Sequence, residues 1–281
     1  MRINTNVSSL TAQEAAANTT KTLTSSLEKL STGLRINKAS DDASGLAIAD
    51  KLRTQATSIN QGIANGNSAV SLLQIADKSM AEQSNILDTV KAKLIQANTD
   101  TTSSAGRESV RKDINKLLTQ LNNIAKQTNY NGTTLLQMSS GSTSASSGLN
   151  FQIGEKSGDT ITNTGIKSNT SGLGLTSLKG FGANTLTQTI AADQQTKIDA
   201  ALTTLNGYRG DIGSTQNQVE SAVRNLMTQA TNVKAAESVI RDVDYAAESA
   251  NFNKQNIISQ AGSYAISQAN SVQQNVLKLL Q

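Results

Sequence analysis

The chain has 281 residues and a formal net charge of +4, and only 36% of its residues are hydrophobic and 2% aromatic. It contains no Cys, His, Pro or Trp. The absence of Cys and His excludes thiolate and imidazole nucleophiles, histidine general bases, Cys/His zinc sites and disulfides. We therefore expect no catalytic residue, no cofactor site and no metal site.

The charges and aromatic side chains are dispersed along the chain. Lys and Arg number 25 against 21 Asp and Glu, and the three Phe and four Tyr are scattered. Nucleic-acid binding requires clustered cations with aromatic stacking platforms. No apolar run approaches the roughly 18 residues of a membrane span, and the first residues lack the apolar core of a secretory signal. We expect neither a nucleic-acid partner nor a membrane partner.

The first arm of the chain, up to about residue 136, has helical periodicity, because its apolar residues recur at spacings of three and four. The terminal run has one phase slip and comprises Ile3, Val7, Leu10, Leu23, Leu27, Leu30 and Leu34. Later runs include Leu52, Ile59, Ile63 and Leu73, and then Ile114, Leu117 and Leu121. Ser40-Asp41-Asp42 before Ala43 is typical of a helix start, and Asn131-Gly132 of a turn.

The second arm, from about residue 187, has the same periodicity. One run includes Ile198, Leu202, Val219, Val223 and Leu226, and the last run comprises Ile258, Ala261, Ala265, Val272, Val276 and Leu279. Since no proline interrupts either arm, the helices are expected to be long.

Between the arms, residues 139–182 hold nine of the 19 glycines. Apolar and polar residues alternate over 149–153 and 160–162, which predicts a small hairpin. The expected fold is mainly α: a long antiparallel helical bundle or coiled coil with a small β-hairpin.

The terminal runs are too narrow to order a helix by themselves, since they are rich in Asn, Gln, Ser, Thr and Ala. The middle runs can form the ordinary core of a helical rod. The terminal helices are expected to become ordered only against neighbouring subunits, by coupled folding and binding. The sequence therefore predicts a subunit that assembles.

Several segments of the sequence resemble a known protein family. The segments Met1–Val7 and Leu30–Asn37, followed by Ala39–Ile48, closely resemble the amino-terminal region of bacterial flagellin. Asn129–Leu136 looks like the turn that closes the amino-terminal arm of that family. Gly213–Val219 and Gln274–Leu280 are similar to its carboxy-terminal arm. The resemblance covers about residues 1–138 and 187–281.

The resemblance implies a domain organisation. Residues 1–43 and 242–281 would be the terminal helices of the inner tube, called D0. Residues 44–186 and 187–241 would be the helical rod, called D1, with 139–186 as a Gly/Ser/Thr-rich hairpin and loop region. The insertion is too short for outer variable domains, so the chain resembles a minimal flagellin.

The resemblance also implies a function and partners. The chain would polymerise with itself, head to tail, into the helical tube that acts as the motility propeller. It would be secreted through the flagellar type III apparatus to an extracellular filament. Implied partners are an export chaperone at the C-terminal helix, the filament cap and the hook-junction proteins.

The resemblance further indicates an altered immune-receptor surface. Flagellins that activate an innate receptor have Arg, Glu and Leu at the positions of Thr89, Ala92 and Lys93. This chain departs at all three positions. We therefore expect weak receptor activation.

Two other functions remain as alternatives. A hook–filament junction protein has similar terminal helices but forms only a short ring, and the match over Leu34–Ile48 favours the filament. A carbohydrate-active enzyme with two carboxylates would need an aromatic-lined sugar pocket, of which the sequence gives no sign. The tripeptide Arg209-Gly210-Asp211, an integrin motif when it lies on a turn, falls on a helical run.

Overall fold

The structure, a computed structural model, describes residues 5–137, 145–183 and 185–279; of residues 273 and 276–279 it describes only the backbone. Of the predicted terminal run, Ile3 lies outside the described residues. For Val276 and Leu279 only the helical backbone is described.

The chain forms two compact units. One consists of residues 1–56 and 231–281, and the other of residues 57–230. The expected domain boundaries, after residues 43 and 241, lie near the start of α2 (Ala43–Asn98) and the end of α5 (Gln188–Arg241), not at the division between the two units. The boundary between the two units falls inside these helices, after residue 56 in α2 and after residue 230 in α5, so each helix contributes to both units.

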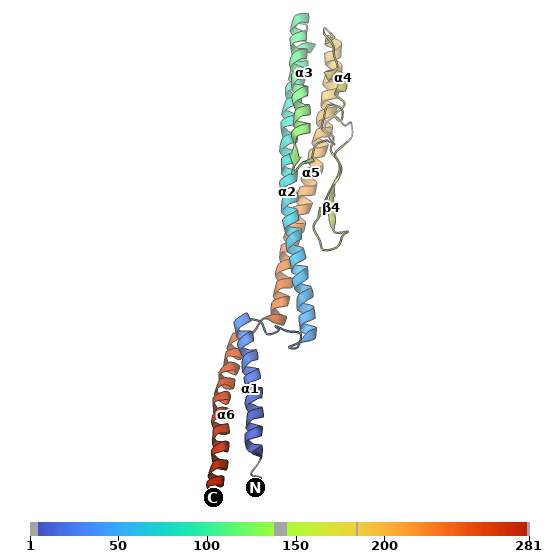
Figure 1. The fold of residues 1–281 in the computed structure, drawn as a ribbon. Helices are drawn as coiled ribbons and strands as arrows, with labels where there is room; N and C mark the ends of the chain where they lie inside the picture. Colours follow the sequence, from blue (N-terminus) through green and yellow to red (C-terminus); the bar gives the residue numbers. More distant parts are fainter. Residues whose placement is uncertain (1–4, 138–144, 184, 280–281) are drawn as a thin grey trace. The chain divides into compact units, whose positions relative to one another are not determined.

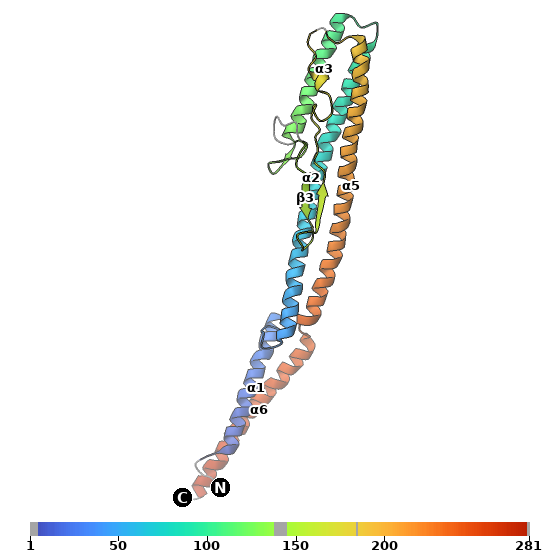
Figure 2. The ribbon, with the colours of Figure 1, turned by 90° about the vertical axis from the view of Figure 1, so that its right-hand side faces the viewer.

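The first unit contains α1 (Val7–Thr32) and α6 (Tyr245–Leu279), which lie side by side in both views (Figures 1 and 2). Asn6 caps α1, because its Oδ1 accepts a hydrogen bond from the Ser9 amide at 3.1 Å. The helix ends at Gly33, whose φ of 74° is a left-handed conformation that costs glycine little. Contacts of the start of α1 with the end of α6 make the pair antiparallel.

The segment between α1 and α2 is tied to the residues between α5 and α6. The Arg35 amide donates to the Arg241 carbonyl at 2.6 Å, and the Val243 amide donates to the Gly33 carbonyl at 3.0 Å. Leu34, predicted as part of the terminal helical run, lies beyond α1 and forms a β-bridge with Asp242. These bonds explain why the first turns of α2 and the last turns of α5 belong to the first unit.

The second unit is a helical rod made from α2, α5 and α3 (Ser104–Gln127). Its largest buried side chains come from all three helices: Leu73, Met80, Leu87, Leu94, Ile114, Leu118, Leu121 and Ile198. The predicted rod residues Ile59, Leu73, Ile114, Leu121, Ile198, Val219 and Val223 are buried. Ile63, Leu117, Leu202 and Leu226 are half-buried, as is Leu52, which lies in the first unit.

Two antiparallel strand pairs follow α3. In the first, β1 (Asn129–Tyr130) pairs with β2 (Thr133–Thr134), and Asn131 and Gly132 have φ values of 49° and 81°. Positive φ at both central residues is typical of a two-residue hairpin turn. In the second, β3 (Leu149–Gln152) pairs with β4 (Thr160–Asn163), so the hairpin predicted from the alternating pattern is confirmed. A short helix, α4 (Thr176–Lys179), was not expected from the sequence.

The second hairpin packs directly on α2. A Cβ atom added to Gly62 would lie 1.9 Å from the Ile153 carbonyl oxygen, so only glycine allows this approach. Three residues later, Asn65 Nδ2 donates to the Gln152 carbonyl at 3.0 Å. Ile153 is buried against Ala69, Val219 and Val223. The predicted class, a mainly α helical bundle with small hairpins, is confirmed.

Candidate assembly surface

The contact between α1 and α6 consists largely of small side chains. On α1 seven of the buried and half-buried residues recur at alternating spacings of three and four: Ser9, Ala12, Ala16, Thr19, Leu23, Ser26 and Leu30. The corresponding positions on α6 include Phe252, Ser259, Gly262, Ile266 and Ala269. A Cβ atom at Gly262 would lie 3.8 Å from the Ala16 Cβ, which is ordinary contact. Small residues on both helices let the two backbones approach closely.

Two polar contacts fix the register of this pair. Asn6 Nδ2 donates to the Ala269 carbonyl at 3.1 Å, and Ser26 Oγ donates to Glu248 Oε1. Ser26 is only 1% exposed, so its hydrogen bond is shielded from water. A shift by one turn would separate both pairs of partners.

A second set of apolar side chains of α6, including Ile257, Tyr264 and Val272, lies away from this contact. We call this set the outer stripe of α6. Its members are separated by three, four or seven residues, except that Tyr264 and Ala265 are adjacent, and all are exposed: Ala250, Ile257, Ala261, Tyr264, Ala265 and Val272. Ile257 is 68% exposed, Tyr264 74% and Val272 54%. On α1, Val7 and Leu10 are likewise 60% and 55% exposed. Large apolar side chains exposed along one face are typical of an interaction surface.

The structure divides the predicted terminal seam between two faces. Leu23 and Leu30 lie on the α1–α6 contact, whereas Val7, Leu10 and the half-exposed Leu27 do not. All the described α6 members are exposed: Ile258, Ala261, Ala265 and Val272. The predicted apolar runs did not include the small residues of the contact, nor Ile257 and Tyr264. The continuous Ser/Ala/Thr/Leu heptad from Ser9 to Leu30 is the signal that could have found the contact.

The segment before α2 is held by charged side chains. Asp41 Oδ2 accepts hydrogen bonds from the Asn37 and Lys38 amides at 3.1 and 3.0 Å. These bonds to Lys38 and Asn37 lower the pKa of the Asp41 carboxyl below its ordinary value of 3.8. A hydrogen bond and ion pair with Glu28, at 2.6 Å, raise the pKa of Lys38. Asp42, predicted to start α2, accepts from the Gly45 amide at 2.9 Å and caps the helix.

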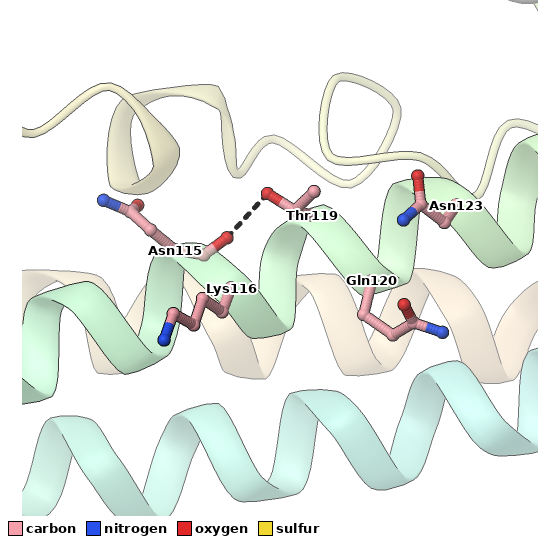
Figure 3. A pocket seen from close by; sticks show the side chains of 5 residues that line it. All are labelled: Asn115, Lys116, Thr119, Gln120 and Asn123. Atoms are coloured by element: carbon pink, nitrogen blue, oxygen red, sulfur yellow. Dashed lines mark hydrogen bonds between the residues drawn. The ribbon is translucent and has the colours of Figure 1, made fainter.

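A surface groove of the rod runs along α3. Figure 3 shows one groove, of about 290 Å³, along α3; its lining residues are Asn115, Lys116, Thr119, Gln120 and Asn123. Thr119 Oγ1 donates to the Asn115 carbonyl at 2.8 Å, a bond within the helix. The groove is lined by amides, a hydroxyl and one ammonium, with no carboxylate pair for glycoside hydrolysis.

Within the described ranges, no group of three or more His, Cys, Asp or Glu is arranged to hold a metal ion. Among the same residues, no helix combines the length and apolar character that crossing a bilayer requires.

The remaining motifs lie on helices of the rod. Arg209-Gly210-Asp211 is inside α5, as predicted, and Arg209 Nε binds Asp77 Oδ1 at 2.8 Å. Thr89 and Ala92 on α2 are exposed, and the half-buried Lys93 forms an ion pair with Asp113 at 3.2 Å. The tripeptide is therefore not on an exposed turn, whereas residues 89 and 92 are accessible.

Comparison with known families gives two matches that together span both arms. Residues 3–141 match the bacterial flagellin N-terminal helical region, and residues 195–280 match the bacterial flagellin C-terminal helical region. A solved structure from Vibrio parahaemolyticus, described as a flagellar hook-associated protein, has a TM-score of 0.58 and covers 72% of this chain and 99% of that chain. At 12% identity, this likeness shows a shared fold alone.

Full-length relatives carry the family assignment. The flagellin of Bacillus subtilis is 34% identical over 303 residues, and the match covers all of both chains. The flagellar filament 33 kDa core protein of Treponema phagedenis is 32% identical over 286 residues, again over all of both chains. With matches to both helical regions and identity above 30% over the whole length, the chain belongs to the bacterial flagellin family.

Proposed function

We propose that this flagellin assembles into the flagellar filament through the outward faces of α1 and α6. Flagellins are structural subunits that polymerise into the filament, and this chain is one of them. Head-to-tail stacking on a helical lattice is a heterologous contact that does not close, so it yields a tube of indefinite length. Such a tube is the propeller of a motile cell.

The observation that carries this proposal is the inversion of the usual amphipathic pattern in α6. Small residues, together with Phe252 and Ile266, line its contact with α1, whereas Ile257, Tyr264 and Val272 face outward. Burying an exposed Ile or Tyr fully contributes on the order of 1.5 to 3 kcal/mol. Neighbouring copies that cover Ile257, Tyr264 and Val272 would gain this free energy in every subunit.

The division into two compact units supports different roles for the terminal helices and the rod. We assign α1 and α6 to the inner tube, D0, and the helical rod with its hairpins, residues 44–241, to D1. The larger buried cluster of the rod comes from residues 72–212, so this part has a core of its own. The α1–α6 contact has few large apolar groups and depends on partners for the rest.

The proposal includes secretion of the chain and interactions with accessory flagellar proteins. The chain would leave the cell through the flagellar type III apparatus and reside in the extracellular filament. The outer stripe of α6 lies on the C-terminal helix, where an export chaperone would cover it before assembly. The filament cap and the hook-junction proteins would contact the assembled ends.

The hook–filament junction role is not favoured. The relatives that match this chain over its whole length are a flagellin and a filament core protein. The likeness to the hook-associated protein is at the level of fold.

Weak activation of innate immune receptors is a separate part of the proposal. Thr89 and Ala92 are exposed, so a receptor at this surface would meet side chains unlike the Arg and Glu of activating flagellins. Dissociated monomer applied to receptor reporter cells should give little signal. Strong signalling would overturn this part alone.

The assembly surface is tested by a double substitution with a matched control. The variant Ile257→Ser/Tyr264→Ser removes two large side chains from the outer stripe of α6. The control Asn253→Ser/Gln260→Ser changes two exposed polar residues of the same helix. Monomers of each are mixed with filament seeds, and polymer is measured by sedimentation and electron microscopy.

The stripe variant should stay in the supernatant at concentrations at which the control and the unmodified chain polymerise. Circular dichroism of the three monomers should be the same, because the changed side chains are exposed and belong to a different compact unit from the rod. Normal polymerisation of the stripe variant would refute the assigned surface.

A further inference from the structure

The chain contains three Asn-Gly dipeptides, and the structure places them in three different surroundings. They are Asn65-Gly66 in α2, Asn131-Gly132 in the turn between β1 and β2, and Asn206-Gly207 in α5. Asn followed by Gly is the pair in which a backbone amide can most easily reach the preceding side chain, because glycine has no Cβ to obstruct the approach. The pair is therefore the place to look for spontaneous deamidation.

We propose that Asn131 is a deamidation site of the folded protein, at which the side-chain amide is converted to a carboxylate. The reaction takes only water as its co-reactant. The Gly132 backbone nitrogen attacks the Asn131 Cγ, the Cγ–Nδ2 bond breaks, and ammonia leaves with the proton from the Gly132 amide. Water then opens the resulting succinimide at Cγ to give aspartate, or at the main-chain carbonyl to give isoaspartate.

The surroundings of Asn131 leave this reaction unobstructed. Asn131 and Gly132 are both exposed, and a Cβ atom added to Gly132 would meet no atom within 4 Å. Over the ranges that the structure describes, the Gly132 amide has no hydrogen-bond acceptor. Each adjoining strand has only two residues, so little structure holds the turn in one conformation.

The Asn65 side chain, in contrast, is held at both ends. Its Nδ2 donates to the Gln152 carbonyl at 3.0 Å, and its Oδ1 accepts from Gln61 Nε2 at 2.9 Å. A Cβ atom at Gly66 would lie 2.4 Å from Val223 Cγ2, so this backbone is tightly packed. Asn65 cannot turn its Cγ toward the following amide without breaking these contacts.

Asn206 is exposed like Asn131 but lies in a helix, so comparing the two sites separates the effect of helix geometry on deamidation from the effect of exposure. Both Asn206 and Gly207 are exposed, and a Cβ atom at Gly207 would meet nothing within 4 Å, as at Gly132. The dipeptide lies inside α5, however, where each amide donates to the carbonyl four residues earlier. The Gly207 nitrogen is therefore engaged, while the Gly132 nitrogen is not.

Conversion at Asn131 has a structural consequence. Tyr130 pairs with Thr133 across a turn of two residues. Isoaspartate adds one carbon atom to the main chain of this turn, so the pair no longer closes in the same register. Aspartate adds a negative charge at the same exposed position.

The experiment uses the folded full-length chain, kept in mildly alkaline buffer and sampled over weeks. Proteolysis and mass spectrometry give the fraction of Asp plus isoAsp at each of the three sites. A parallel sample is kept in concentrated guanidinium chloride, where all three dipeptides are unfolded. The variant Asn131→Asp serves as a mass and retention standard for the product.

In the folded sample, the converted fraction should rise severalfold faster at Asn131 than at Asn206 or Asn65. In the denatured sample, the three rates should become similar. Conversion of Asn206 as fast as Asn131 in the folded chain would overturn the proposal. The same preference for Asn131 in the denatured chain would also overturn it, because the turn would then have no part in the selectivity.

Discussion

At the residue scale, two helical glycines with opposite surroundings give a matched pair of predictions. Gly62 in α2 faces the Ile153 carbonyl, 1.9 Å from an added Cβ, whereas Gly207 in α5 faces open space. Gly62→Ala should lower the free energy of unfolding by about 1 to 3 kcal/mol, because the hairpin must move. Gly207→Ala should raise it by about 0.5 to 1 kcal/mol, because alanine favours the helix.

Urea unfolding of the two monomeric variants, followed by circular dichroism, measures both effects. Amide exchange over β3 and β4 should also increase in Gly62→Ala, since the bond from Asn65 to Gln152 depends on the same approach. Equal stability changes in the two variants would show that the hairpin does not pack on α2 as closely as the structure has it.

Asp41 gives a prediction about pH at the same scale. Its pKa is lowered by the Lys38 and Asn37 amides, so its stabilising effect is complete above its ordinary value of 3.8 and is lost as the pH falls through the lowered value. Filaments of Asp41→Asn should dissociate at a lower temperature than unmodified filaments at neutral pH. The loss should correspond to about 1 kcal/mol, since the hydrogen bonds are exposed to solvent.

The difference in dissociation temperature should shrink as the pH falls below 3.8 and disappear below the lowered pKa of Asp41, where the carboxyl is neutral in the unmodified chain too. Asp100→Asn, an exposed residue after α2, removes the same charge and should behave as the unmodified chain does. A constant gap across the acidic range would argue against a role for the Asp41 carboxylate.

At the scale of elements, α1 and α6 should be stable only in the assembled state. Their contact consists largely of Ser, Ala, Thr and Gly, which bury little apolar area. Backbone amides of both helices should therefore exchange rapidly in dilute monomer and become protected in filaments. Amides of α3 should be protected in both states, because Ile114, Leu118 and Leu121 are fully buried within the rod.

Hydrogen exchange followed by mass spectrometry makes this comparison within one molecule, with α3 as the internal reference. Slow exchange in α1 and α6 of lone monomers would mean that the small-residue contact suffices, and coupled folding would have to be abandoned.

The sequence predicts the elements of this chain better than it predicts which faces they pair. Periodicity in Leu and Ile gave the long helices, and alternation gave the β3–β4 hairpin, since both patterns reflect burial within one subunit. In α1 and α6 the same rule fails in part, because many of the large apolar residues are exposed in the subunit and its internal contact consists largely of small ones. The short helix α4 has only four residues, which are too few for a helical period to be recognised in the sequence.

At the scale of the whole molecule, the rod should survive without the end of the chain. Its two buried clusters lie within residues 69–223, and neither includes any of the side chains that the structure describes in 247–281. Deletion of 247–281 removes most of α6, with the outer stripe and the partner of α1. The truncated protein should be soluble, with the urea midpoint of the rod unchanged, and should form no polymer on filament seeds.

Three measurements separate assembly from folding in this truncation. Urea unfolding reports on the rod, sedimentation reports on polymer, and hydrogen exchange reports on α1, which should be unprotected at any protein concentration. The Asn253→Ser/Gln260→Ser chain, which keeps the outer stripe, is the polymerising control. Fibres formed by the truncated chain would place the assembly contacts on the rod, whereas a lowered midpoint would show that the rod draws stability from α6.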